Sequence, residues 1–463
     1  MSNFDQLRQK HPRFIYDSFS YQIEGTNLNI KWFFKLEPDI SFTPTLSIPL
    51  SANLANLQDP TLETVIFNLG MVEMISYWKV SCAPIIEIKP RSLTETEQAW
   101  WLKLFTLGLG EFFFTNQIDF TAADLITFEF DHDAQPSPVI NTQANQPPQL
   151  KKSLLLPLGG GKDSLVSLEL LKKTNLDITL FALNPSQATS EIISLNSHLK
   201  AISATRTIDP KLLELNNLGY LNGHTPFSAL AAFVTTLISY LYQLDLIAVS
   251  NEESANEPNT TFNGININHQ YSKSFEFETD FRDYQNLMGL PSNYFSLLRP
   301  WHELQIAQIF SQLAPRYFPI FKSCNVGQKQ NIWCHKCSKC LFAFLMLFPF
   351  IDQQVLTTKI FHANLFESES LVETALKLII KSKTKPFDCV GSYQESKVAF
   401  YLSIQKYLKS NQKLPVILET VNQAVISRED NWPALRKQML SDWNDQHFLT
   451  PDLVALLKSS QQL

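Results

Sequence analysis

The sequence predicts an α/β protein built around a doubly wound parallel sheet. Three short apolar stretches are typical of buried strands: "SLLLPL" from Ser153, "DITLFALN" from Asp177 and "DLIAVSN" from Asp245. Between them, "SLVSLELLKK" and "SALAAFVTTLISYLYQL" have the patterns of helices. Strands that alternate with helices form parallel sheets through βαβ crossovers. We expect this α/β domain to cover residues 153–320.

The chain before this region predicts a different unit, an N-terminal α+β domain over residues 1–135. The aromatic-rich stretch 13–36 alternates in polarity and predicts strands broken by a turn at Glu24-Gly25. Ser92 is followed three residues later by Glu95, a capping box that opens a helix. Residues 136–152 are rich in Pro, Gln and Asn without periodicity, which favours a linker. We expect residues 321–463 to form a cysteine-cluster segment and a mainly helical C-terminal region.

Composition limits the classes of protein. With 463 residues and 44% hydrophobic residues, the chain can form large cores and two or three domains. Its net charge of −6 argues against a nucleic-acid binder, although a local pocket can still bind small anions. The N-terminus lacks the apolar core of a signal peptide, and the apolar run 340–351 is shorter than the ~20 residues of a membrane span. We expect a cytoplasmic protein without membrane insertion and leave its oligomeric state open.

The glycine turn, Gly159-Gly160-Gly161-Lys162-Asp163-Ser164, joins the first strand of the α/β domain to its helix. Doubly wound sheets bind phosphates at such a turn, because glycines let the backbone approach and free N–H groups face the anion. The sequence differs from a Walker A loop at two positions. It also differs from a dinucleotide-binding fingerprint, because the last glycine is absent and the second strand ends in Asn184 where that fingerprint has an acidic residue. The loop S-G-G-x-D-S of ATP pyrophosphatases matches at all positions but the first. A plain turn before a helix is the alternative.

Roles within this turn follow from residue type. Lys162 adds charge, Ser164 donates a hydrogen bond, and Asp163 is a candidate ligand for Mg²⁺ on the phosphates. The candidate ATP-binding residues are Gly159, Gly160, Gly161, Lys162, Asp163, Ser164 and Asn184.

A polar loop follows the third strand and covers residues 248–278. It leaves the same sheet edge as the glycine turn and is dense in groups that move protons or bind anions. Arg282 and Arg299 further along are candidate clamps for substrate carboxylates. The alternative is a solvated loop that is rich in Asn and Ser because it turns.

Four cysteines form a Cys324-x9-Cys334-x2-Cys337-x2-Cys340 segment, while Cys82 and Cys389 stand alone. Four thiolates with two tight C-x-x-C steps suit tetrahedral zinc, so a structural Zn²⁺ is the first interpretation. A redox or catalytic role, with Cys324 as the candidate, and buried unliganded thiols are the alternatives. We expect His335 inside the segment to be a neighbour of the cluster and not a ligand.

The "GGGKDS" turn and the cysteine segment together resemble the 7-cyano-7-deazaguanine synthase branch of the ATP-pyrophosphatase superfamily. Over roughly residues 13–350 the chain is similar to the UDP-N-acetylmuramoyl-L-alanyl-L-glutamate epimerase (MurL) family. The stretches that carry this similarity include "NLGMVEMISYWKVSCAPIIEI", "LGEFFFTNQIDF", "SNEESANEPN", "NHQYSKSFEFE" and "YFSLLRPWHELQIA". The helical tail matches less closely. Gly159 stands where the superfamily has Ser, which removes one hydroxyl donor.

The resemblance implies a sheet of the PP-loop (adenine nucleotide α-hydrolase) type and ATP-dependent inversion of the terminal L-Glu of UDP-MurNAc-L-Ala-L-Glu in peptidoglycan synthesis. It implies ATP and Mg²⁺ as cofactors, a glutamyl-adenylate, and release of AMP and pyrophosphate. Adenylation removes the negative charge of the carboxylate and makes the α-hydrogen more acidic, so that one group can remove it and another can return a proton to the other face. The candidates for these groups are Glu252, Glu253, His269, Lys273, Glu276 and Cys324.

The N-terminal domain is a candidate for enclosing the UDP-sugar, with Trp78, Lys79 and Glu111, although core packing of Trp78 explains its presence equally well. Two alternative functions stay open. One is another adenylating ligase or synthase on the same fold, and the other is a zinc-stabilised nucleotide-binding module without catalysis.

Overall fold

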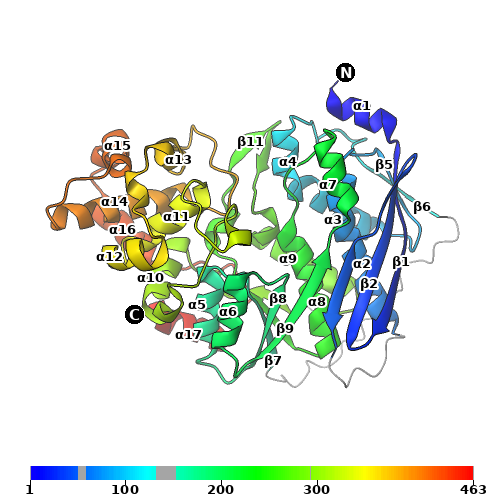
Figure 1. The fold of residues 1–463 in the computed structure, drawn as a ribbon, viewed down its shortest axis with the longest axis horizontal. Coiled ribbons are helices and arrows are strands. Elements are labelled where there is room, and N and C mark those ends of the chain that lie inside the picture. The colour runs from blue at the N-terminus through cyan, green and yellow to red at the C-terminus, as the bar shows by residue number, and fades with distance from the viewer. Residues whose placement is uncertain (1, 51–58, 132–152, 292, 462–463) are drawn as a thin grey trace.

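The computed structural model describes residues 2–50, 59–131, 153–291 and 293–461 (Figure 1). The predicted linker 136–152 lies outside the described residues. The strands are β1 (Arg13–Glu24), β2 (Asn27–Leu36), β3 (Ile40–Phe42), β4 (Thr45–Pro49), β5 (Ile85–Ile88), β6 (Thr127–Phe130), β7 (Ser153–Pro157), β8 (Asp177–Leu183), β9 (Lys200–Thr207), β10 (Leu246–Val249), β11 (Thr260–Phe262), β12 (Ile265–Ile267) and β13 (Tyr294–Ser296). All but the β11–β12 hairpin belong to one sheet.

The strand order of this sheet is β13-β10-β7-β8-β9-β4-β2-β1-β5-β6, with β3 paired to β2. Neighbouring strands from β13 to β9 are parallel, which confirms the prediction for the α/β part. The whole sheet is mixed, because β4 pairs with β9 and β2 in antiparallel fashion. The β4–β9 pairing joins the strands of the two predicted domains into one sheet. The division into an N-terminal and an α/β domain stays a prediction.

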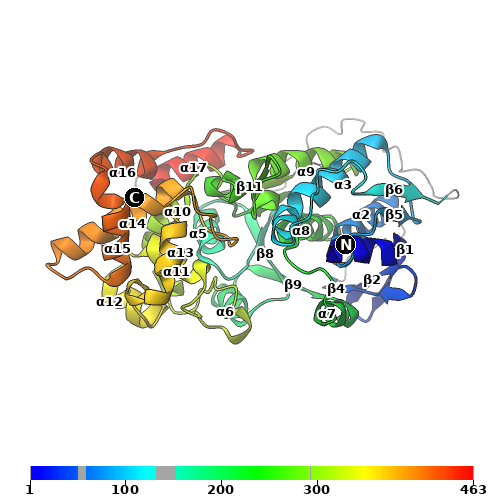
Figure 2. The ribbon, with the colours of Figure 1, turned by 90° about the horizontal axis from the view of Figure 1, so that it is seen from above.

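The helices are α1 (Asn3–Lys10), α2 (Pro60–Trp78), α3 (Glu95–Gly108), α4 (Gly110–Thr115), α5 (Lys162–Leu171), α6 (Gln187–Leu195), α7 (Pro210–Asn217), α8 (Phe227–Tyr242), α9 (Phe275–Leu287), α10 (Glu303–Leu313), α11 (Ser338–Leu347), α12 (Gln353–Val355), α13 (Val372–Lys377), α14 (Tyr393–Lys409), α15 (Val416–Ala424), α16 (Trp432–Ser441) and α17 (Pro451–Gln461). Helices α10 to α16 gather at the end of the molecule opposite β1 and β2 (Figures 1 and 2). The described part of the chain after Pro300 contains helices and loops, as the sequence predicts.

Two groups of buried apolar side chains form the core. One lies between the N-terminal strands and helices α2, α3, α8 and α9. The other lies between β7, β8 and the helices α5, α10, α11 and α14. Burial of this much apolar surface is the main force that stabilises both halves.

Two local predictions in the N-terminal part can be compared directly. The turn after Glu24 is confirmed, because β1 ends at Glu24 and β2 begins at Asn27. The capping box is wrong by two residues. Helix α3 begins at Glu95, and Thr94 with Glu97 caps it, with the Glu97 carboxylate 2.8 Å from the Thr94 amide nitrogen. The sequence "SLTETE" satisfies the capping pattern twice, and the structure uses the second register.

The apolar run that begins at Cys340 forms most of α11, whose residues from Lys339 to Leu347 are buried in the C-terminal core. Among the described residues, no helix combines the length and the apolar character that crossing a bilayer requires.

Candidate active site

The candidate active site is a cavity of about 490 Å³ at the carboxyl ends of the central parallel strands. The chain runs from β7 outward to β8 and β9, then returns to the other side of β7 to form β10. The loops that follow β7 and β10 diverge at this switch point, and residues from both line the cavity. Open α/β sheets bind ligands at such a point. The topology therefore places this cavity where a nucleotide would be expected.

The glycine turn forms one wall of the cavity. Gly159, Gly161, Asp163 and Ser164 line it, and Gly161 is the N-cap of α5. The Gly160 carbonyl accepts a hydrogen bond from the Lys322 amide at 2.9 Å, which fastens the turn to the segment that leads to Cys324. Because the first N–H groups of a helix have no partner within the helix, this arrangement suits an anion.

Lys162 does not reach into the cavity. Its ammonium group is buried between the carboxylates of Asp163 and Glu303 and forms ion pairs with both. Burial raises the pKa of Glu303, and the nearby Asp163 charge raises it further. Burial favours the neutral form of Asp163, but the Lys162 charge outweighs it and lowers the pKa of Asp163. Lys162 thus positions Asp163, which lines the cavity.

The cavity is rich in cations although the chain as a whole is acidic. Lys273, Lys322, Lys339 and His269 line it together with the neutral ring of His224, and Asp163 is the one aspartate or glutamate among its described lining residues. Low-dielectric walls concentrate the field of such charges. The cavity therefore favours an anionic ligand such as a phosphate or carboxylate.

Gly160 provides a test of the turn that does not depend on its ligand. Its φ of +84° opposes a side chain, and a methyl carbon placed there would lie 3.2 Å from Thr189 Oγ1. We expect Gly160→Ala to lower the free energy of unfolding by about 1–2 kcal/mol, measured by urea denaturation. Gly159→Ala is the matched control, since a methyl group there meets no atom within 4 Å. Equal losses in both variants would contradict this account.

A second polar cluster lies beside the glycine turn and contains two of the predicted catalytic residues. His269 Nδ1 contacts the carboxylate of Glu111, and its Nε2 lies 3.9 Å from Cys389 Sγ. Lys273 Nζ lies 3.3 Å from the same sulfur. Cys389 could not be recognised as a site residue from the sequence, because "PFDCVGS" matches no motif and both His269 and Lys273 are more than 100 residues away.

Of the other predicted catalytic residues, Cys324 lines the cavity from the cysteine segment, and the three glutamates lie elsewhere. Glu252 is buried and does not line the cavity, and burial is the main cause of its raised pKa. Glu253 and Glu276 line a separate cavity. Glu253 accepts a hydrogen bond from Asn256 at 3.0 Å, and Glu276 forms an ion pair with Lys103 at 2.7 Å.

The two predicted carboxylate clamps are engaged within the protein. Arg299 is fully buried and pairs with Glu278 at 2.9 Å. It also donates to the carbonyls of Glu252 and Lys273, so it fixes loops around the cavity and is not available to a substrate. Arg282 donates to the Tyr294 carbonyl and lies over the ring of Phe448.

Three further candidates lie outside the cavity lining. Trp78 is completely buried in the N-terminal core and donates to the Ala83 carbonyl, so the core interpretation fits it. Lys79 is buried and donates to Thr225 Oγ1 at 2.8 Å, which fastens the segment that carries His224. The Asn184 amide bonds twice to the backbone of Arg206, just after the end of β8.

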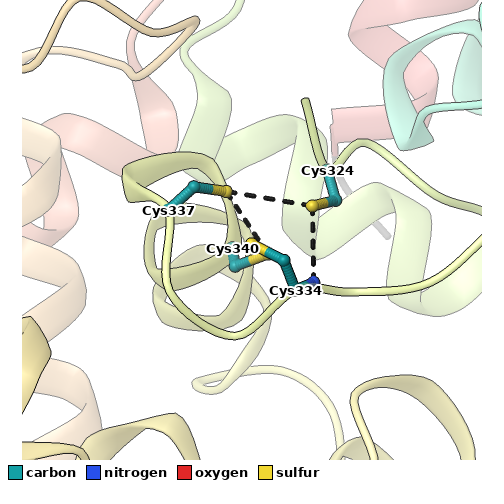
Figure 3. Close-up of side chains that lie close together, drawn as sticks. All are labelled: Cys324, Cys334, Cys337 and Cys340. Atoms are coloured by element: carbon teal, nitrogen blue, oxygen red, sulfur yellow. Dashed lines mark hydrogen bonds between the residues drawn. The ribbon is translucent and has the colours of Figure 1, made fainter. Parts of the chain in front are cut away.

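The four clustered cysteines come together at the start of α11, as Figure 3 shows. Their sulfurs all lie within 4.8 Å of one another, with Cys324–Cys337, Cys334–Cys340 and Cys337–Cys340 separations of 3.9, 3.7 and 3.5 Å. Tetrahedral zinc with Zn–S bonds of about 2.3 Å requires S–S distances of about 3.8 Å. The cluster therefore fits zinc. His335 Nε2 instead contacts the Phe361 carbonyl at 2.6 Å, as expected of a neighbour.

Two family models match the chain, the MurL N-terminal domain over residues 5–297 and the MurL C-terminal domain over residues 320–433. The chain belongs to the MurL family. Proteins named UDP-N-acetyl-alpha-D-muramoyl-L-alanyl-L-glutamate epimerase are similar to it. The one from a Micromonospora species is 36% identical over 78% of this chain and 79% of its own length. Those from Salinispora tropica and Xanthomonas oryzae pv. oryzae are 34% and 33% identical, over 78% and 72% of each chain.

Membership in the MurL family makes this chain an enzyme of the isomerase class. It argues against a nucleotide-binding module without catalysis. No solved structure shows a significant match to the chain. The assignment of the MurL sheet to the PP-loop type therefore stays a prediction.

Proposed function

We propose that this enzyme inverts the α-carbon of the terminal L-Glu of UDP-MurNAc-L-Ala-L-Glu, and that it uses ATP to activate the adjacent carboxylate. The observation that carries the proposal is the glycine turn at the switch point of the sheet, open to a cavity lined by three lysines. The substrate follows from the names of the relatives. The product would enter peptidoglycan synthesis.

The chemistry needs an activation step because the α-hydrogen of a carboxylate is a poor acid. An oxygen of the α-carboxylate attacks the α-phosphorus of ATP, and pyrophosphate leaves. The acyl-adenylate has lost the carboxylate charge, so a carbanion at the α-carbon is stabilised by the acyl group. We assign binding of the triphosphate to the N-terminus of α5, which the glycine turn precedes, and to the lysines that line the cavity. Asp163 fits Mg²⁺ bound to the phosphates, and Mg²⁺ there would neutralise charge on the leaving group.

The test is to incubate the enzyme with ATP, Mg²⁺ and UDP-MurNAc-L-Ala-L-Glu. Pyrophosphate is then measured, and the glutamate of the hydrolysed product is analysed on a chiral column. We expect both pyrophosphate and D-Glu. UDP-MurNAc-L-Ala is the control, because it lacks the residue to be inverted. ATP turnover without inversion would favour a ligase or synthase with another acceptor, and inversion without ATP would refute the adenylate.

We also propose that Cys324, Cys334, Cys337 and Cys340 hold a structural Zn²⁺. Cys337 is the N-cap of α11, and Cys324 lies in the segment that lines the cavity near the glycine turn. A zinc ion would thus connect α11 to one wall of the active site. It would act on the position of this wall and not on the reacting atoms.

Removal of the zinc is expected to destabilise the protein. Structural zinc sites contribute about 10–16 kcal/mol of binding free energy in small domains, so we expect Cys337→Ser to lower the zinc content well below one ion per chain and to lower the Tm. The matched control is Cys82→Ser, a buried cysteine outside the cluster. Zinc content by elemental analysis and Tm by scanning calorimetry are the measurements. A Cys337→Ser protein with unchanged zinc and Tm would contradict the assignment.

A further inference from the structure

Cys389 lies in the loop between α13 and α14 and lines the same cavity as Asp163 and the glycine turn. Its thiol is half-buried. It is separated by more than 100 residues from His269 and Lys273, whose side chains lie next to its sulfur, so the fold brings them together. None of the four cluster cysteines takes part in these contacts.

Glu111, His269 and Cys389 form a line of three groups. The Glu111 carboxylate contacts Nδ1 of His269, which directs Nε2 toward Cys389 Sγ at 3.9 Å. A carboxylate that holds an imidazole in one orientation, with the other ring nitrogen facing a nucleophile or base, is a recurring arrangement for proton transfer. His224 lies beside His269, with ring centroids 4.5 Å apart, and its Nδ1 lies 3.4 Å from the same Glu111 oxygen.

The charges around the sulfur favour a thiolate. Burial alone would raise the pKa of Cys389, but Lys273, His269 and Lys339 outweigh it and lower the pKa to about 5. Burial alone would lower the pKa of His269, but Cys389 and Glu111 raise it to about 9. Both shifts favour a thiolate and an imidazolium at neutral pH. Burial lowers the pKa of His224 well below its usual value, so that ring is neutral.

The loop that carries Cys389 is fixed on both sides. Gln270 donates to the Val390 carbonyl at 3.1 Å, and Asn325 donates to the Asp388 carboxylate at 2.6 Å. Lys339 donates to the carbonyl of Cys389 itself. A catalytic group must be held within a fraction of an ångström of its working position, and these bonds provide that support.

We propose that Cys389 is the catalytic base of this enzyme, that its thiolate removes the α-hydrogen of the activated glutamate, and that His269 and Glu111 position it. This inference rests on the proposed function. The inference extends that function, because it names the group that removes the α-hydrogen.

The thiolate takes the α-hydrogen as a proton and becomes a thiol, while the C–H electron pair moves into the acyl group of the adenylate. A water molecule in the cavity returns a proton to the opposite face of the α-carbon. The hydroxide left behind attacks the acyl carbon, and AMP leaves with the bonding electron pair. The thiol then loses its proton to solvent, because the positive charges of Lys273 and His269 stabilise the thiolate.

The test separates adenylation from proton removal by measuring both in Cys389→Ala. We expect exchange of the glutamate α-hydrogen in D₂O to fall by about 10²–10⁴-fold, the usual contribution of a general base. Substrate-dependent pyrophosphate release should stay within about tenfold of wild type, because the glycine turn is intact. Cys82→Ala is the matched control, with both rates unchanged. Exchange at the wild-type rate in Cys389→Ala would overturn the inference, and loss of exchange in His224→Asn alone would reassign the base to His224.

Pyrophosphate release by the wild-type enzyme tests the proposed function independently of the assignment of the base. A wild-type enzyme that exchanges the α-hydrogen without releasing pyrophosphate would refute adenylation, while loss of exchange in Cys389→Ala would still support the base. Glu111, His224 and His269 offer ligand atoms within 4.8 Å of one another, so a metal ion bound by them is the alternative to a proton-transfer role. The zinc content of the protein distinguishes the two. Two zinc ions per chain, with one lost in His269→Gln, would assign His269 to a metal and overturn the inference.

Alkylation of Cys389 tests the positioning role of His269. It uses proteins that keep Cys389, so it gives a result even where Cys389→Ala does not fold. We expect iodoacetamide to alkylate Cys389 of the wild-type full-length protein rapidly at pH 7, as mapped on peptides, because a thiolate reacts and a thiol does not. His269→Gln should shift the pH profile of this alkylation upward. ATP with substrate should protect Cys389. A thiol that reacts only above pH 8 in the wild type would contradict the thiolate.

Discussion

Replacement of Lys162 by methionine is expected to reduce pyrophosphate release by about 10²-fold or more and to lower the free energy of unfolding by about 3–5 kcal/mol. The ammonium group is buried between two carboxylates, Asp163 and Glu303, and Glu303 is 2% exposed. Without the lysine these two negative charges repel each other in a medium of low dielectric. One of them must take up a proton or move, and Asp163 would leave its position in the cavity.

A double variant distinguishes the loss of charge balance from loss of packing. Lys162→Met with Glu303→Gln removes one of the two carboxylate charges, so we expect it to recover much of the stability lost in Lys162→Met alone. Activity should not return, because Asp163 still lacks its partner. Urea denaturation and the pyrophosphate assay measure the two effects. Equal destabilisation in the single and double variants would show that the charges are not the cause.

Local sequence predicts the glycine turn well because its determinants are neighbours in the chain. An apolar strand, three glycines and an amphipathic helix follow one another within 20 residues, and the structure has β7, the turn and α5 at these positions. The cysteine cluster was predictable for the same reason. Its four sulfurs lie within 17 residues, and their spacing already suggests a common centre.

Contacts between distant residues could not be predicted in this way. Cys389 belongs to the cavity only because the loop before α14 folds back against His269, 120 residues earlier. Glu111 comes from α4, 158 residues before His269, and no periodicity relates these positions. For Arg299, the local sequence suggested a role that the structure does not support. An arginine near a polar loop suggests a carboxylate clamp, but its complete burial against Glu278 depends on the packing of α9 against β13.

This buried arginine is the second position where we expect a large effect. Arg299→Met is expected to lower the free energy of unfolding by about 3–5 kcal/mol, because it leaves the buried Glu278 charge without its partner. It also removes the bonds at 2.7 and 2.6 Å that fix the carbonyls of Glu252 and Lys273. Lys273 lines the cavity beside Cys389, so α-hydrogen exchange should fall together with stability.

The matched control is Lys200→Met, which breaks an ion pair with Asp177 on the surface, where the two side chains are 72% and 58% exposed. Water screens such a pair, so we expect a change below about 1 kcal/mol and normal exchange. Arg299→Met with Glu278→Met removes both buried charges and should regain stability without regaining exchange, because the two carbonyls remain unbound. If the double variant recovered exchange as well, Arg299 would serve only to neutralise Glu278, and the position of Lys273 would depend on other contacts.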